Sequence, residues 1–119
     1  MSRRRWVPPL LWAAMILVLT SIPGSQLPST NVHDADKLVH LTMYGVLGWL
    51  CARALWTRGR LARSALLVLA AISLFGALDE WHQQFIPGRS MELLDWISDT
   101  AGAGAGLLAM ALTRREARS

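Results

Sequence analysis

Residues 79–90 form the densest polar stretch of the chain, Asp79-Glu80-Trp81-His82-Gln83-Gln84-Phe85-Ile86-Pro87-Gly88-Arg89-Ser90. They place acids, an imidazole, amides and a guanidinium within about two helical turns and one tight turn. The turn at Pro87-Gly88 is so short that the helices on either side of it must be antiparallel neighbours. Because the sequence around this stretch is largely apolar, its polar side chains indicate a site between packed helices.

Composition favours a membrane protein over a soluble one. The chain has 119 residues, of which 53% are hydrophobic and only 17% are charged, and its mean hydropathy is +0.33. The apolar residues fall in four blocks of roughly 17 to 23 residues, at about 6–22, 37–56, 64–86 and 92–113, and each block can cross a hydrocarbon layer of about 30 Å. We therefore expect an all-α, polytopic membrane protein with four transmembrane helices in a single domain over residues 1–119.

The first block resembles a secretory leader because it follows three arginines. It ends at Ile22-Pro23-Gly24, where no small-x-small cleavage site is present. We therefore expect this helix to be retained.

The distribution of charge predicts how these helices are oriented. Ten of the twelve basic residues lie in three clusters within residues 3–5, 53–63 and 114–118, whereas seven of the eight acids lie within residues 34–36 and 79–99. By the positive-inside rule, both termini and the middle loop are cytoplasmic and the two acid-bearing turns are outside. The net charge of +4 does not point to nucleic acid, because arginines that flank membrane segments more often fix topology and contact anionic lipid.

Each of the last three blocks carries its polar residues on one helical face, near the acidic turns. Lys37, His40 and Tyr44 follow helical spacing in the second block, and Asp95 and Asp99 do so in the fourth. Counted from the basic ends at about 1.5 Å per residue, the polar faces reach the same depth, roughly 22 to 24 Å. We expect one shared cluster near the outer interface, made of Lys37, His40, Tyr44, Asp79, Glu80, His82, Gln83, Arg89, Asp95 and Asp99.

Three kinds of chemistry suit such a cluster. A carboxylate and an imidazole act as general base and acid on a lipid-linked substrate in the first, with Glu80, His82, Asp95 and Asp79 as catalytic candidates. A ligand's carboxylate or phosphate is bound in the second, with Lys37, His40, Tyr44, Gln83, Arg89 and Asp99 as candidates. A divalent metal is held in the third, with His40, His82, Asp79 and Asp99 as candidates, although no tight H-x-x-x-H spacing supports it.

A purely structural alternative stays open, in which the same groups pair with one another and fix helix register. Against it, seven acids face only Lys37 and Arg89 on the outer side, so negative charge is in excess in a dry place. The glycines in residues 102–106 are typical of close helix packing rather than of a phosphate loop, and Gly102 and Gly106 would also allow a homo-oligomer. The single cysteine, Cys51, excludes an internal disulfide.

At these residues the chain resembles the VanZ-like family of small bacterial membrane proteins. The resemblance rests on Asp36-Lys37-Leu38-Val39-His40 with Tyr44, on the run Glu80-x-His82-Gln83-x-x-x-Pro87-Gly88-Arg89, on Asp95 and on the helix with Gly102 and Gly106. It covers about the last two-thirds of the chain. The family pattern usually has asparagine where Asp99 stands, so this chain carries an additional charge there.

The resemblance implies a multi-spanning membrane protein, related to one that lowers susceptibility to the glycopeptide teicoplanin, and it assigns no catalytic residue. Together with the charge pattern, it leads us to expect a multi-pass protein of the bacterial inner membrane with an extracytoplasmic polar site. We expect that site to bind or modify a cell-envelope molecule, such as a lipid-linked or peptidoglycan-related precursor or a phospholipid headgroup. A transporter subunit or proton-coupled module is the alternative, although no inverted repeat is evident.

Overall fold

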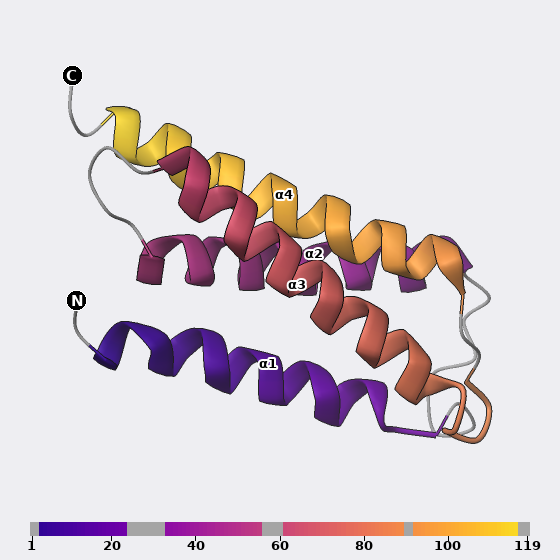
Figure 1. Ribbon diagram of the computed structural model, residues 1–119. Coiled ribbons are helices and arrows are strands. Elements are labelled where there is room, and N and C mark those ends of the chain that lie inside the picture. Colours follow the sequence, from indigo (N-terminus) through magenta and orange to yellow (C-terminus); the bar gives the residue numbers. More distant parts are fainter. Residues whose placement is uncertain (1–2, 24–32, 56–60, 90–91, 117–119) are drawn as a thin grey trace.

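The computed structural model describes residues 3–23, 33–55, 61–89 and 92–116, which form four α-helices and contain no strand. A short 3₁₀ turn, η1 (Arg3–Trp6), leads into α1 (Val7–Thr20), and then follow α2 (His33–Leu55), α3 (Leu61–Gln83) and α4 (Leu93–Glu116). Consecutive helices run in opposite directions, so that the chain passes up and down through an elongated bundle of 49 × 26 × 20 Å (Figure 1). The all-helical expectation is confirmed.

Local sequence explains where the helices begin and end. Pro8 and Pro9 lie in the first turn of α1, where the missing amide protons have no helical acceptor to lose. After α3, the turn contains Gly88 with a φ of 76°, a backbone conformation that a residue with a Cβ rarely adopts. The Arg89 amide donates to the Ile86 carbonyl at 3.0 Å and closes this turn. The second helix begins at His33, slightly earlier than the sequence pattern indicates.

The closest pair of helices is α2 and α4, which meet along a surface that we call the glycine seam, formed by Gly45, Gly48, Gly102 and Gly106. A Cβ atom on Gly102 would overlap the carbonyl oxygen of Leu41, and one on Gly106 would overlap that of Gly45. Such contact of main chain with main chain is what small residues permit between helices in lipid. The seam lies within one chain, and the homo-oligomer through Gly102 and Gly106 stays a prediction.

An apolar core fills the bundle between these helices. Trp12 of α1 packs at its edge and donates its indole N–H to the carbonyl of Met43 at 2.8 Å, which ties α1 to α2. The buried members of the core come from all four helices, namely Ile16, Met43, Tyr44, Leu47, Ala52, Val68, Ile72, Ala103, Leu107 and Met110.

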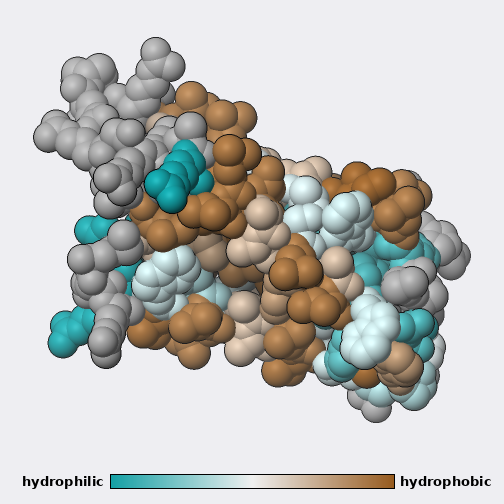
Figure 2. All heavy atoms as spheres, viewed as in Figure 1, coloured by the Kyte–Doolittle hydropathy of each residue, from teal (hydrophilic) through white to brown (hydrophobic). Residues whose placement is uncertain are grey.

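Large apolar side chains also lie on the outer surface of the bundle. Examples exposed by half or more of their surface are Leu10, Leu11 and Val18 on α1, Leu38 on α2, Leu66 and Leu74 on α3, and Leu93 and Leu108 on α4. Brown apolar residues cover much of the middle of the face in Figure 2, with hydrophilic residues toward its ends. Two segments, Lys37–Leu55 and Ala65–Gln83, are long and apolar enough to cross a membrane. These features indicate a membrane protein.

Candidate functional site

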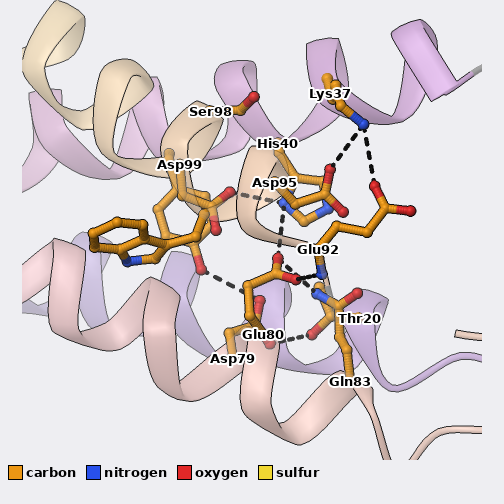
Figure 3. Close-up of polar contacts among 12 residues, drawn as sticks. Thr20, Lys37, His40, Asp79, Glu80, Gln83, Glu92, Asp95, Ser98 and Asp99 are labelled. Carbon is orange, nitrogen blue, oxygen red and sulfur yellow. Dashed lines mark hydrogen bonds and ion pairs between the residues drawn. The ribbon is translucent and has the colours of Figure 1, made fainter. Parts of the chain in front are cut away.

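Buried polar side chains gather at the end of the bundle where α2 and α4 begin and α3 ends (Figure 3). Seven of them, each at most 3% exposed, make up what we call the polar cluster: His40, Tyr44, Asp79, Glu80, Gln83, Asp95 and Asp99. They come from α2, α3 and α4. Helical spacing predicted that these residues share one surface, and in the structure they lie together on a surface that faces the interior.

His40 is the centre of this cluster. Its Nδ1 atom lies 2.7 Å from Asp99 Oδ1 and 3.8 Å from Glu80 Oε1. An ionised Asp99 can only accept a hydrogen bond, and in that state Nδ1 carries the shared proton. One imidazole from α2 thus connects a carboxylate of α4 with a carboxylate of α3.

Asp79 lies deeper between α1, α2 and α3. Its Oδ1 atom accepts a 2.7 Å hydrogen bond from the hydroxyl of Thr20, and its Oδ2 atom accepts one of 3.3 Å from the hydroxyl of Tyr44. Sequence reasoning missed Thr20, because a threonine at the end of an apolar helix gives no signal of a distant partner. The first helix therefore takes part in the site as well as covering it.

Glu80 is held by neighbours from its own helix and from the start of the segment that leads into α4. The Gln83 amide donates to Oε1 and the backbone N–H of Glu92 donates to Oε2, each at 3.4 Å. Both contacts are long, so they orient the carboxylate without occupying it strongly.

Lys37 lies at the edge of the cluster. Its ammonium is 3.2 Å from Glu92 Oε2 and 3.4 Å from Asp95 Oδ1. The lysine side chain remains 23% exposed and that of Glu92 34%, whereas Asp95 is buried. Glu92 was not among the predicted site residues, and its contact with Lys37 adds it to the edge.

Two of the predicted site residues have other surroundings. Arg89 donates from Nε to the Ile22 carbonyl and from Nη2 to the Leu19 carbonyl, each at 3.0 Å, so its guanidinium caps the end of α1. His82 is partly buried, and its Nδ1 atom has no hydrogen-bond partner among the described residues. The structure thus brings together eight of the ten residues that the sequence grouped, and it holds Arg89 on a neighbouring helix end.

The cluster contains more acids than cations. Four carboxylates are buried in it, Lys37 pairs with one of them, and Arg89 is engaged by carbonyl groups. Asp99 is 0% exposed, and its Oδ2 atom has no hydrogen-bond partner in the described part of the chain. Removing carboxylates from water without paired charges is costly. This arrangement suits a bound cation or a proton-transfer group.

One subset of the cluster has the spacing of metal ligands. His40, Glu80 and Asp95 each offer a ligand atom, and these atoms lie within 4.8 Å of one another. The sequence proposed a different set, which shares only His40 with this one. Asp79 instead binds Thr20 and Tyr44, and Asp99 binds the imidazole.

Comparison with known proteins agrees with the pattern of these residues. No curated protein and no solved structure matches the chain. A family model described as VanZ/LLP1 matches residues 5–114, a range that includes all four helices up to the last turn of α4 and every residue of the polar cluster. The match covers nearly the whole chain, and the protein therefore belongs to the VanZ/LLP1 family.

Proposed function

We propose that this protein is a four-span protein of the bacterial inner membrane whose polar cluster binds or modifies a cell-envelope molecule from the extracytoplasmic side. Apolar side chains exposed on all four helices support four spans. The exposed Arg53 and Arg63 lie at the end of the bundle opposite the polar cluster, where both described termini also lie (Figure 1). With the positive-inside rule, this separation favours cytoplasmic termini and an outward cluster.

The observation that carries the proposal is the convergence of four buried carboxylates with His40. A fold that needed only cross-helix hydrogen bonds could use neutral pairs, such as the hydroxyls of Ser73 and Thr100, which lie 3.1 Å apart between α3 and α4. Buried acids without enough cations lower stability, so their presence favours a role in binding or chemistry.

The charge of the cluster limits the ligands that suit it. A group with an ammonium would be attracted directly, and a phosphate or carboxylate would need a cation bound with it. Lipid-linked precursors, phospholipid headgroups and peptidoglycan-related peptides carry such groups close to the membrane surface. Membership of the VanZ/LLP1 family is consistent with an envelope role of this kind, including lowered susceptibility to teicoplanin-type glycopeptides.

The experiment is a susceptibility assay in a teicoplanin-sensitive bacterial host. Expression of the protein is expected to raise the inhibitory concentration of teicoplanin, and Glu80→Gln is expected to return it to the value of cells with the empty vector. Gln84→Ala is the matched control, because Gln84 is exposed one turn along the same segment. Membrane levels of all three proteins are compared by immunoblot. Full protection by Glu80→Gln at an equal protein level, or no protection by the parent protein, would reject the proposal.

A structural role for the cluster has its own support, since Asp79 joins α1, α2 and α3 through Thr20 and Tyr44. Under that alternative, Glu80→Gln would lower the amount of folded protein and the assay would show lost protein rather than lost protection. Thermal unfolding of the purified variant in detergent separates the two outcomes.

A further inference from the structure

We propose that His40, Glu80 and Asp95 bind one divalent transition-metal ion. The three side chains come from three different helices, and each is at most 3% exposed. Their ligand atoms lie within 4.8 Å of one another. A site shared among three helices would fix α3 against the α2–α4 pair, so the ion would act on both chemistry and packing.

The distances suit a bound ion after small side-chain rotations. Zinc bonds to imidazole nitrogen and carboxylate oxygen are about 2.0 to 2.2 Å, so neighbouring ligand atoms in a tetrahedral site lie about 3.4 Å apart. The three ligand atoms lie within 4.8 Å of one another, so each must shift by an ångström or so to reach this separation. Glu80 accepts two long hydrogen bonds of 3.4 Å and lies 3.8 Å from His40 Nδ1, contacts weak enough to leave its carboxylate able to approach an ion.

Asp99 acts as a positioning residue for the imidazole ligand. When ionised it accepts the proton of His40 Nδ1 at 2.7 Å, and Nε2 is then the ring nitrogen whose lone pair would bind the metal. Histidine ligands in metal sites usually donate their second ring N–H to a carboxylate or carbonyl in this manner. The charge that this chain carries at position 99 thereby has a specific role.

An independent observation also points to a missing partner inside the cluster. The Oδ2 atom of Asp99 belongs to a side chain that is 0% exposed, and it has no hydrogen-bond partner among the described residues. Buried carboxylate oxygens are nearly always paired with a donor. A cation bound in the cluster would offset this excess of buried negative charge.

The ligand types select the class of ion. Calcium and magnesium take oxygen ligands almost exclusively, whereas an imidazole with two carboxylates suits zinc, manganese or iron. Three protein ligands also leave a coordination position open, as in catalytic zinc sites. A phosphate or carboxylate of the envelope molecule would bind at that open position. This part of the inference rests on the proposed function.

Lys37 competes with the ion, because its ammonium lies 3.4 Å from Asp95 Oδ1. In the absence of metal, the lysine holds one of the three ligands. We therefore expect Lys37→Gln to bind the ion more tightly than the parent protein, the opposite of what loss of a ligand produces.

The test uses the full-length protein, purified in detergent with a tag that contains no histidine and stripped with a chelator. Zn²⁺ and Mn²⁺ are titrated by calorimetry, and the bound metal is counted by mass spectrometry after desalting. About one ion per chain is expected for the parent protein. Glu80→Gln and Asp95→Asn should each weaken binding by about tenfold or more, and Asp99→Asn by about 10- to 100-fold. Asp79 belongs to the metal-ligand set that the sequence suggested. Asp79→Asn should weaken metal binding less than Glu80→Gln or Asp95→Asn does.

A spectroscopic measurement guards against variants that fail to fold. Co²⁺ added to the stripped parent protein should give visible absorption typical of nitrogen and oxygen coordination, and Zn²⁺ should abolish it. No stoichiometric ion in the parent protein, or a greater loss from Asp79→Asn than from Glu80→Gln, would overturn the inference. Metal binding without protection from teicoplanin would reject the proposed function and leave the metal site intact, so the two failures are distinguishable.

Discussion

The Nδ1 atom of His40 lies 2.7 Å from the Oδ1 atom of Asp99, a residue 59 positions later in the chain, and neither side chain reaches solvent. This pair fastens α2 to α4 at the polar end of the bundle, one turn beyond the nearest glycine contact of the two helices. Hydrogen bonds to charged groups contribute about 1.5 to 3 kcal/mol, and a buried partner left alone costs about as much.

We therefore expect His40→Ala and Asp99→Ala to be non-additive in metal-free protein. The double variant should be more stable than the sum of the single changes indicates, with a coupling energy of about 1 to 3 kcal/mol. Unfolding in detergent measures the cycle. Ser98→Ala combined with His40→Ala is the additive control, because the Ser98 hydroxyl bonds only its own helix at Leu94. Additivity in both cycles would show that the pair has no energetic role.

The glycine seam predicts a contrast between two neighbouring glycines of α4. A Cβ atom on Gly106 would overlap main-chain atoms of α2, whereas a Cβ atom on Gly104 meets nothing within 4 Å. Gly106→Ala should therefore lower the free energy of unfolding by about 1 to 3 kcal/mol. Gly104→Ala should raise it by up to about 1 kcal/mol, since alanine is the better helix former. Equal effects in thermal unfolding would mean that α2 and α4 do not meet at this seam.

Thr20 tests whether α1 belongs to the site. Thr20→Val keeps the shape of the side chain but removes the 2.7 Å hydrogen bond to Asp79, and the unpaired carboxylate oxygen should cost about 1 to 3 kcal/mol. Thr42→Val is the matched control, because the exposed Thr42 hydroxyl bonds only the carbonyl of Leu38 in its own helix. Its unfolding free energy should change by at most about 0.5 kcal/mol. Similar losses from both changes would contradict a specific contact with Asp79.

Arg89 distinguishes a capping role from a ligand-binding role. Its two hydrogen bonds to the carbonyls of Leu19 and Ile22 predict that Arg89→Ala destabilises the protein by about 1 to 3 kcal/mol. Lysine cannot reproduce the planar fork of a guanidinium, so Arg89→Lys should restore less than half of that loss. The alternative outcome, a stable Arg89→Lys protein that no longer protects cells from teicoplanin, would assign Arg89 to the ligand, as the sequence first suggested.

Orientation in the membrane is tested with single cysteines in a Cys51→Ala background. Gln84→Cys lies near the polar cluster and Arg53→Cys near the opposite end, and both positions are exposed. A membrane-impermeant maleimide should label intact cells at position 84 and should label position 53 only after lysis. Labelling in the reverse order would place the polar cluster on the cytoplasmic side and reject the outward site.

Much of this architecture can be predicted from residue spacing. The rest cannot, and the reasons are physical. The periodic placement of His40, Glu80 and Asp99 determines which faces turn inward, so their meeting was predictable. The exact partners depend on side-chain rotamers and on helix rotation, which a pattern does not specify. For this reason the sequence grouped Arg89 with the acids, whereas the guanidinium reaches back to α1.

The same reason explains Thr20 and the metal ligands. A hydroxyl has the same hydropathy at every position of an apolar helix, so nothing in residues 6–22 indicates that one of them reaches Asp79. Asp79 and Glu80 are neighbours on α3 and differ in direction by about a quarter turn of the helix. The rotation of α3 therefore decides which of the two carboxylates faces His40.

The glycine seam has a consequence for access to the acids. Because α2 and α4 meet main chain to main chain at the seam, no side chain there can change rotamer to let them slide, and we expect the two helices to move together. In contrast, α3 meets this pair through side chains, such as the rings of Phe75 and Tyr44, whose centroids lie 6.0 Å apart. His40 and Asp95 lie on this pair and Glu80 lies on α3, so a tilt of α3 relative to the pair would separate Glu80 from the other two side chains.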